Sequence, residues 1–437
     1  MSVLCLCCGM VFLGLPSTLV FLGPEDLSSA ENVRVEAQVP STHRTLVPKD
    51  PAQPGLWFSP AAAIPAAGET WIWYQRVNKA ETEYADQRTL CLGILRDGAW
   101  TCPEVNPTPP ARGGPNNVVL TRSPHPPTWG GFNVFQILKE RQQYRMLYWD
   151  QPESGPAGGM LAASLDGVHW QKDPPAAVFT EHNDAFSLLK KDGKYLLYQT
   201  MLEDWPDKPY PDNLDKKRRV QSLRESYDLL TWTPQKPLLR PDAEDPPETE
   251  FYLMKPFAYG GRYAALLFKY FADPNAPNKH SAKYAHELIV SADARAWVRP
   301  FRSVDLGVWT YADPFMDQGQ LCFVYGKDSA IDLASYRKDG LTAAAAEEPG
   351  QFTTKTFSAP SGKCFANLDA RQGWVEFGLL SGSGQRLPGL LPCRIEGIEG
   401  TDVPLPLQIP PQIVAGIKLF RFQIRMAHAR LFAVTGA

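Results

Sequence analysis

Short runs of aromatic, aliphatic and β-branched residues recur along the chain between clusters of turn-forming residues. Five of these runs cover residues 70–76, 144–149, 195–200, 263–270 and 321–325. Each run follows a turn that contains Gly or charged residues, which is typical of a β-strand that begins after a tight turn. We therefore predict five strands that take equivalent places in five similar units.

A sequence motif repeats at nearly the same period. Ser-x-Asp-x-x-x-Trp occurs three times and ends at Trp170, Trp232 and Trp297, which are 62 and 65 residues apart (232−170 and 297−232). A shortened copy ends at Trp100, 70 residues before the first full one (170−100). Ser and Asp side chains bond the backbone of tight turns, and a Trp ring can be buried in the sheet that follows. The motif thus predicts a structural turn, and its period predicts a blade of four short strands.

The fold class that follows is all-β, with a five-bladed β-propeller over residues 56–345. Residues 341–349 predict a short helix or linker that ends the propeller. Residues 350–437 contain alternating strands without the Trp motif, which indicates a small C-terminal β-sandwich.

The chain begins with an apolar run, at residues 3–23, of the length of a signal peptide or membrane anchor. We expect residues 1–30 to be this leader or anchor, with cleavage before Glu31 as one outcome. Residues 31–55 lack periodicity and are expected to form a connecting arm. The protein is accordingly predicted to be exported, to the periplasm, to the extracellular space or to a membrane by its anchor.

Composition and charge exclude some partners. The chain has 44 Lys and Arg against 47 Asp and Glu, a net charge of −3, which gives no electrostatic footprint for nucleic acid. We predict a carbohydrate substrate, no nucleic-acid partner, and membrane contact only through an uncleaved N-terminal segment. The oligomeric state is left open.

The cysteines outside the leader are odd in number and show no CxxC spacing, so we predict neither a disulfide framework nor a metal site. Cys91 and Cys102 flank a turn, and a bridge between them across one hairpin is left open. No cofactor is predicted, and the sequence leaves room for a structural channel cation such as calcium.

Candidate chemistry lies a little before the apolar runs. If each blade brings the start of its innermost strand to one mouth of a channel, polar residues upstream of the runs converge there. The candidate catalytic carboxylates found in this way are Asp184, Glu250 and Asp313. Neighbouring carboxylates repel, which raises the pKa of one and gives the acid and base that glycosidic cleavage requires. We assign Glu250 as acid and Asp184 as base or nucleophile, with a turn or salt-bridge role as the alternative for each.

Polar, charged and aromatic residues of the same segments are candidates for substrate binding. They are Asn133, Trp149, Asp150, His182, Asn183, Arg219, Tyr252, Lys255, Lys279, His280 and Trp309. The cations Arg218, Arg219, Lys279 and His280 are expected either to be solvated loop charges or to hold an acidic sugar, a sulfate or a phosphate.

Two segments, residues 183–198 and 312–315, resemble the Asp-Pro and Asp-Gly-x-Tyr-Tyr-Leu phrase of five-bladed glycosidases, the invertase, arabinanase and xylosidase group. The resemblance implies a propeller, followed in invertases by a β-sandwich, and a trio of carboxylates on the first three blades. Here the second blade has Asn133 instead, and the acids fall on blades three to five. The Trp motif also resembles the Asp-box of sialidases, which have six blades.

The most direct hypothesis is a glycoside hydrolase that acts on an oligo- or polysaccharide. Mannoside phosphorylases are also five-bladed, so phosphate-dependent cleavage is one alternative. A propeller that binds carbohydrate without cleaving it is the other.

Overall fold

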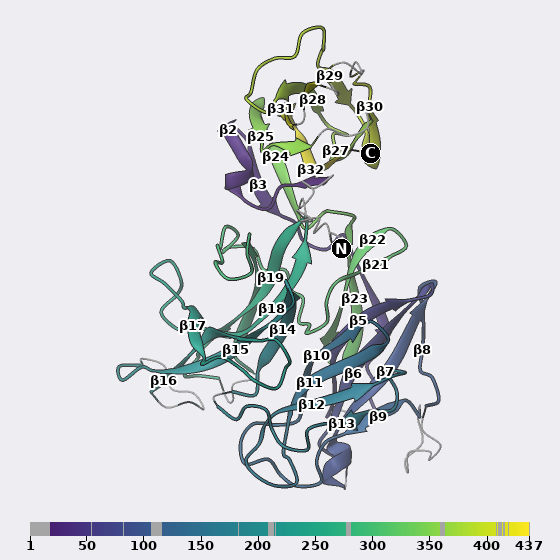
Figure 1. The fold of residues 1–437 in the computed structure, drawn as a ribbon, viewed down its shortest axis with the longest axis vertical. Coiled ribbons are helices and arrows are strands. Elements are labelled where there is room, and N and C mark those ends of the chain that lie inside the picture. Colours follow the sequence, from purple (N-terminus) through teal and green to yellow (C-terminus); the bar gives the residue numbers. More distant parts are fainter. Residues whose placement is uncertain are drawn as a thin grey trace, which may run out of the picture. The chain divides into compact units, whose positions relative to one another are not determined.

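The computed structural model describes residues 18–436, except 54, 82, 106–115, 182, 209–213, 215, 277–280, 359–362, 408, 410–412, 414–415 and 418. The chain divides into two compact units, of which unit 2 is Ala37–Leu341 and unit 1 contains the described residues on either side of it. The sheets of both units are antiparallel (Figure 1), and the predicted all-β class is confirmed.

The described residues of unit 2 form five sheets, each built mainly from strands that follow one another in the sequence. The first has the order β5–β6–β7–β8, with β9 paired to β7 and the short helix η2 before β7. Its elements are β5 (Leu56–Ala66), β6 (Glu69–Asn78), η2 (Tyr84–Gln87), β7 (Arg88–Arg96), β8 (Ala99–Thr101) and β9 (Val118–Thr121).

The next two sheets have four strands each, in sequence order. The strands of the second sheet are β10 (Asn133–Glu140), β11 (Gln143–Asp150), β12 (Gly158–Ser164) and β13 (Gln171–Lys172). Those of the third are β14 (Phe186–Lys191), β15 (Lys194–Asp204), β16 (Lys217–Ser226) and β17 (Lys236–Leu239).

The last two sheets differ in how they end. The fourth contains β18 (Thr249–Tyr259), β19 (Arg262–Phe271) and β20 (Lys283–Ser291). The fifth contains β21 (Phe315–Asp317), β22 (Gln320–Lys327), β23 (Ala330–Arg337) and β4 (Thr42–Val47), which comes from the other end of the unit.

The five sheets follow one another in space through their first strands. β5, β10, β14 and β18 contact each other in succession, and β21 and β22 contact β5. Between the fourth and fifth sheets, the rings of Phe257 on β18 and Phe323 on β22 lie 5.7 Å apart. Five sheets are the number that the repeat period predicts. The apolar runs seen in the sequence, however, are the second strand of each sheet, because a strand with partners on both sides is the most continuously buried.

The repeated Ser-Asp-Trp motif forms the same turn in three sheets. The Oδ1 atom of Asp166 accepts a hydrogen bond from the backbone N–H of His169 at 2.8 Å. Asp228 and Asp293 accept the same bond, from the residue three positions later, at 2.8 and 2.7 Å. The turn needs a left-handed residue after the Asp, and φ is +77° at Gly167. The predicted turn role of the motif is confirmed.

Unit 1 is built from two six-stranded sheets. One has the order β3–β24–β32–β27–β30, with β1 on β32, and consists of β1 (Thr18–Val20), β3 (Arg34–Ala37), β24 (Thr342–Ala346), β27 (Cys364–Asp369), β30 (Glu399–Leu405) and β32 (Ala429–Gly436). The other has the order β2–β25–β31–β28–β29, with β26 on β31. Its elements, with the short helix η1 before β2, are η1 (Pro24–Asp26), β2 (Leu27–Glu31), β25 (Gly350–Thr354), β26 (Phe357–Ser358), β28 (Trp374–Ser381), β29 (Cys393–Glu396) and β31 (Leu419–Ala427).

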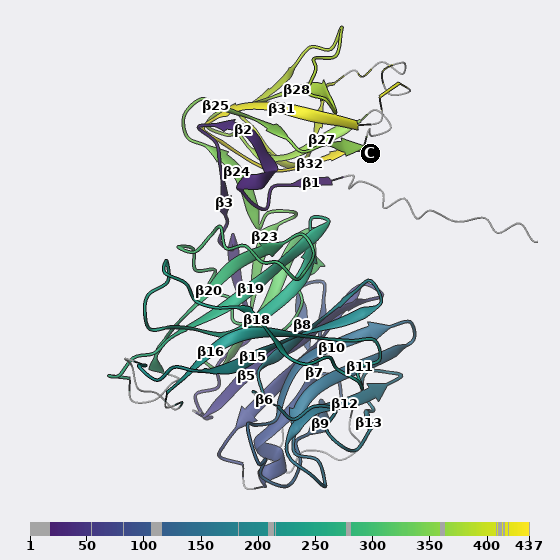
Figure 2. The same cartoon turned by 60° about the vertical axis from the view of Figure 1, so that its left-hand side comes forward.

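The two sheets of unit 1 share one apolar core, as a sandwich requires. Leu368 and Leu431 contribute from the first sheet, and Phe377 and Phe422 from the second. Figure 2 shows β28 beside β31, its hydrogen-bonded neighbour. The predicted sandwich is therefore present, and it also contains N-terminal strands.

The predicted boundaries differ from those of the structure. Residues 31–55, expected to be a connecting arm, contribute β3 to unit 1 and β4 to unit 2. β4 is an edge strand whose residues Thr42–Thr45 are exposed, so its sequence shows no apolar alternation. β1 lies within residues 1–30, the expected leader, and β2 runs from Leu27 to one residue beyond it, whereas residues 1–17 lie outside the described chain.

The alanine run after unit 2 is a strand and not the expected helix or linker. Ala343, Ala344, Ala345 and Ala346 are all buried in β24, which pairs with β32 and lies next to β3. Alanine favours helices by itself, but burial between two strands overrides that weak preference. The C-terminal part of the sandwich accordingly begins at Thr342, earlier than the predicted residue 350.

The cysteines of the described chain, Cys91, Cys102, Cys322, Cys364 and Cys393, are free. The bridge left open between Cys91 and Cys102 does not form. In the β7–β8 hairpin Ile94 pairs with Thr101, so the next residue, Cys102, lies beside Gly93 and not beside Cys91. Cys91 pairs with Val118 of β9 instead. Among the described residues, none of the helices is long and apolar enough to cross a membrane.

Candidate functional site

Four of the predicted polar residues lie at the starts of first strands. Asn133 begins β10, Glu250 is the second residue of β18, and Asp184 and Asp313 stand two residues before β14 and β21. The second strand begins ten residues after Asn133 and Asp184 (143−133 and 194−184), twelve after Glu250 (262−250) and seven after Asp313 (320−313), so counting back from the apolar runs reaches this part of each sheet. The sequence thereby leads to equivalent strand ends.

Asp184 is held by its neighbours from the second sheet. Its Oδ2 atom accepts hydrogen bonds from Asn133 Nδ2 at 2.7 Å and from the Gly131 backbone N–H at 3.0 Å. The Asn133 Oδ1 atom accepts in turn from Arg88 Nη1 at 3.1 Å. Donors around a carboxylate favour its ionised form, so this side chain suits a base or nucleophile.

Asp313 forms a second group with Lys255 and Gln136. Lys255 Nζ lies 2.8 Å from Asp313 Oδ1, and Gln136 Nε2 donates to Oδ2 at 3.1 Å. Lys255 also donates to the Gln136 Oε1 atom. Burial lowers the pKa of Lys255, and the Asp313 carboxylate opposes that change. Lys255 is fully buried whereas 40% of the Asp313 side chain is exposed, so Lys255 positions the carboxylate that reaches solvent.

Glu250 is placed differently from the other two carboxylates. It is fully buried, and it accepts from Arg219 Nη1 at 2.7 Å and from Lys208 Nζ at 2.8 Å. Both carboxylate oxygens are thus bonded to protein cations and have no contact with solvent. Glu250 and Arg219, expected as the acid and as a substrate contact, form a buried ion pair that connects β16 and β18.

Aromatic rings gather next to these groups. Trp309 lies 5.0 Å from the ring of Tyr284 and 6.4 Å from that of Tyr252, and its Nε1 atom donates to Tyr311 Oη at 3.2 Å. Burial raises the pKa of Tyr311, and the nearby Tyr252 and Asp184 raise it further. Tyr252 and Trp309, both predicted for substrate binding, are thus part of one aromatic cluster near Asp184.

Three further predicted residues have structural partners. Trp149 is buried and donates from Nε1 to the Trp129 carbonyl oxygen at 2.9 Å. Asp150 is also buried, which raises its pKa, and it accepts from the Ser123 N–H at 2.9 Å. Asn183 accepts from the Ala185 N–H at 3.0 Å in the loop before β14. These contacts fix the loops around the site.

The remaining predictions concern loop cations and histidines. His182, Lys279 and His280 lie outside the described residues. Arg218 donates to the Thr249 carbonyl oxygen at 2.8 Å and stacks on Trp205, with 4.5 Å between the guanidinium carbon and the ring centroid. Its role in the described chain is to attach β16 to the start of β18.

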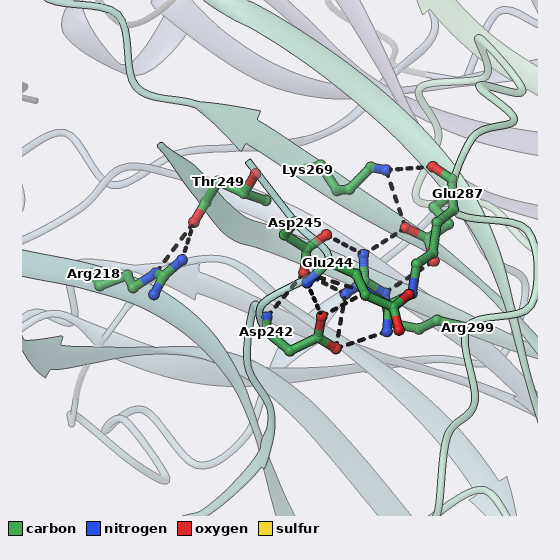
Figure 3. Close-up of polar contacts among 9 residues, drawn as sticks. Arg218, Asp242, Glu244, Asp245, Thr249, Lys269, Glu287 and Arg299 are labelled. Carbon is green, nitrogen blue, oxygen red and sulfur yellow. Dashed lines mark hydrogen bonds and ion pairs between the residues drawn. The ribbon is translucent and has the colours of Figure 1, made fainter. Parts of the chain in front are cut away.

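Buried charges fix the fourth sheet (Figure 3). Arg299 donates to Asp245 at 2.6 Å and to Glu287 at 2.7 Å, and Lys269 lies 3.1 Å from Glu287. Glu287 is fully buried, and breaking such a pair typically costs about 3–5 kcal/mol. The network holds the loop that leads into β18, and Glu250 is the second residue of that strand.

The sequence analysis missed Arg88, Gln136 and Tyr311. Gln136 carried a signal, since it is a polar residue within an apolar strand, and it is fully buried in the structure. Arg88 and Tyr311 carried none, because their importance comes from partners on other sheets. Among the described residues, no group of three or more His, Cys, Asp and Glu side chains is arranged to hold a metal ion.

Among known proteins, only solved structures match this chain. No family model and no curated protein matches it. A glycosyl hydrolase from Bacteroides ovatus is 16% identical, with 69% of this chain and 93% of that chain covered and a TM-score of 0.43. A GH32 beta-fructofuranosidase from Bombyx mori is 11% identical, with coverage of 90% and 94% and a TM-score of 0.44. A beta-1,2-mannobiose phosphorylase from Listeria innocua is 10% identical, with coverage of 73% and 96% and a TM-score of 0.44. The chain is thus similar, at low identity, to glycoside hydrolase and phosphorylase structures.

Proposed function

We propose that unit 2 is a carbohydrate-active propeller that cleaves a glycosidic bond where the starts of its first strands meet. The supporting observation is the common neighbourhood of Asp184, Tyr311 and Asp313. Asn133 and Gln136, both on β10, donate to Asp184 at 2.7 Å and to Asp313 at 3.1 Å, and Asp313 follows Tyr311 by two residues. Carboxylates beside aromatic rings can bind a sugar and stabilise the positive charge of an oxocarbenium-like transition state.

Asp184 is the proposed base or nucleophile, because it accepts from an amide and a backbone N–H and is partly exposed. Asp313 is the second carboxylate, held by the buried Lys255. Glu250 is assigned an electrostatic and structural role. Part of the proposal is that the chain is exported, as its apolar N-terminal run suggests, and that it acts without a cofactor.

The test is the release of reducing ends from a panel of oligosaccharides by the full chain and its Asp184→Asn variant. Removing a positioned acid–base group is expected to lower kcat by about 10²–10⁴-fold. Asp192→Asn is the matched control, since Asp192 lies in the turn between β14 and β15 with 79% of its side chain exposed. Equal rates for the parent and Asp184→Asn would contradict the assignment, and a strict need for inorganic phosphate would assign phosphorolysis instead.

A second candidate function is carbohydrate binding without cleavage. It is favoured by the hydrogen bonding of the carboxylates, because Asp184 and Asp313 both accept bonds from amide or ammonium donors and Glu250 is enclosed by two cations. Glycan binding that is unchanged in Asp184→Asn, together with no reducing-end release by the parent, would select this function.

A further inference from the structure

A pocket of about 300 Å³ opens beside the loop that contacts Asp184. Its walls come from the end of β6, the helix η2, the start of β7, the segment after β9 and the loop before β10. The lining residues are Lys79, Tyr84, Gln87, Arg88, Arg122, Gly130 and Gly131. Three of the seven are cations and none is an acid, so the pocket is positively charged.

Arg122 is the most unusual residue of this pocket. It is only 7% exposed, and its guanidinium lies over the Tyr84 ring, 3.7 Å from the centroid, and donates to the Tyr84 hydroxyl. Its Nε atom is buried without a hydrogen-bond partner, and within the described parts of the chain no carboxylate forms an ion pair with it. Burial lowers the Arg122 pKa and the neighbouring Arg88 lowers it further, whereas Tyr84 and Asp150 raise it. Arginine stays charged at neutral pH, so a buried charge without a close counter-ion is left in the pocket wall.

The pocket is connected to the proposed cleavage site by one chain of hydrogen bonds. Arg88 donates to the Phe132 carbonyl oxygen at 2.9 Å and to Asn133 Oδ1 at 3.1 Å, and Asn133 donates to Asp184 at 2.7 Å. Gly130, another wall residue, has φ +70°, and a Cβ atom there would lie 2.9 Å from Asp184 Oδ2. A group bound in the pocket would therefore lie next to Asp184, within reach of the same substrate molecule.

We propose that this pocket is a subsite for an acidic sugar, and that Arg122, Arg88 and Lys79 bind its oxyanion. The inference depends on the proposed carbohydrate function of unit 2 and names the substrate class of that site. The Arg fork matches the two oxygens of a carboxylate or the oxygens of a sulfate ester, and stacking on Tyr84 fixes its plane. Among the described residues Arg122 has no carboxylate within ion-pair distance, and the bound anion would supply this counter-charge.

The size of the pocket favours an anion that is attached to a sugar over a free ion. A water molecule takes about 30 Å³ of liquid, so 300 Å³ exceeds what phosphate alone fills. Pockets for small organic ligands begin at about this volume. Free phosphate is retained as an arm of the experiment because it offers the same oxygens.

The experiment is calorimetric titration of the full chain with digalacturonate and diglucuronate, their methyl esters, a sulfated disaccharide and inorganic phosphate. The esters keep the sugar and remove the charge. We expect at least one acidic sugar to bind at least tenfold more tightly than its neutral counterpart, with the difference reduced by added salt. Lys79→Met and Arg122→Gln should each reduce that preference at least tenfold or abolish binding of the acidic form. Lys49→Met, which removes an exposed cation of unit 2 outside the pocket, should leave it unchanged.

Each outcome bears on the subsite separately from the cleavage chemistry. Equal binding of acid and ester, or a preference that survives both pocket variants, would overturn the inference. Binding of phosphate but of no acidic sugar would overturn the sugar source and assign the pocket to a free anion. Lys79 is exposed, so Lys79→Met tests the pocket even where Arg122→Gln fails to fold. In one outcome the parent chain binds acidic sugars more tightly than their esters, keeps this preference in Asp184→Asn, and cleaves no substrate. That result would support the subsite and contradict the proposed cleavage.

Discussion

At the scale of single residues, the turn after the third strand of a sheet is fixed by one buried hydroxyl. Ser226 is 3% exposed, and its Oγ atom accepts from the backbone N–H of Leu229 at 2.9 Å and donates to Asp228 Oδ1 at 3.0 Å. Leu229 has φ +68°, a conformation that a leucine adopts only when its surroundings impose it. The Ser hydroxyl is one of those constraints.

Ser226→Ala is expected to destabilise the protein by about 1–3 kcal/mol, the cost of leaving a buried N–H without an acceptor. The measurement is the free energy of unfolding in urea, followed by circular dichroism. Thr231→Ala, in the same turn, is the control, because Thr231 is exposed and contributes its backbone N–H to the turn. A Ser226→Ala variant as stable as the parent would show that the Asp228 hydrogen bonds and packing hold the turn without the Ser226 hydroxyl.

At the scale of elements, β4 closes the fifth sheet from the far end of unit 2. It pairs with β23 in the register Leu333–Arg44 and Ala334–His43, across nearly the whole sequence of the unit. Thr42–Thr45 are exposed and contribute through the backbone ladder, whereas Leu46 and Val47 also pack against an apolar core. Such a long-range pairing carries a larger loop-closure entropy cost than a hairpin does.

Proline in β4 is therefore expected to destabilise unit 2. We predict that Arg44→Pro or Thr45→Pro removes a ladder bond, because successive N–H groups of an edge strand point alternately toward and away from its partner. Hydrogen exchange measured by mass spectrometry should show faster exchange in β23 and unchanged exchange in β28 of unit 1. Slow exchange in β23 of both variants would contradict a closing role for β4.

At the scale of the whole molecule, the stability of unit 2 should depend on acidic pH. Although burial raises the Asp305 pKa, the His286 ring nitrogen 3.6 Å away and hydrogen bonds from the backbone N–H groups of His286 and Gly307 lower it to about 2. Backbone hydrogen bonds likewise lower the pKa values of Asp228 and Asp293. These carboxylates stabilise the fold at pH values above their unfolded pKa of about 3.9, and the contribution is lost as pH falls toward 2.

The melting temperature is accordingly expected to fall between pH 4 and pH 2, and to fall less steeply in Asp305→Asn. The variant has no charge to lose at this position, so its curve should approach that of the parent at the acid end. Scanning calorimetry from pH 2 to pH 6 measures both curves. Parallel curves over this range would mean that Asp305 does not contribute to acid unfolding.

The sequence by itself determined the repeat, the turns and the strand starts. Each depends on local chemistry, since Asp166 and its equivalents bond backbone atoms within three residues, and Asp184 and Asp313 each stand two residues before the strand that follows them. Tertiary structure alone decided the partners. Glu250 is enclosed by Arg219 and Lys208, which precede it by 31 and 42 residues, so no local pattern could show that its carboxylate is buried between two cations.

The same division holds for the strands and for the pocket. The alanines of β24 and the polar residues of β4 became strands because neighbouring strands offered them backbone partners, which no local pattern encodes. Arg122 and Arg88 line one pocket because β7 and β9 are adjacent in a sheet. Side-chain type and spacing set which turns and strands form, whereas burial and long-range pairing set which charges meet, because the free energy of a buried charge depends on neighbours distant in the sequence.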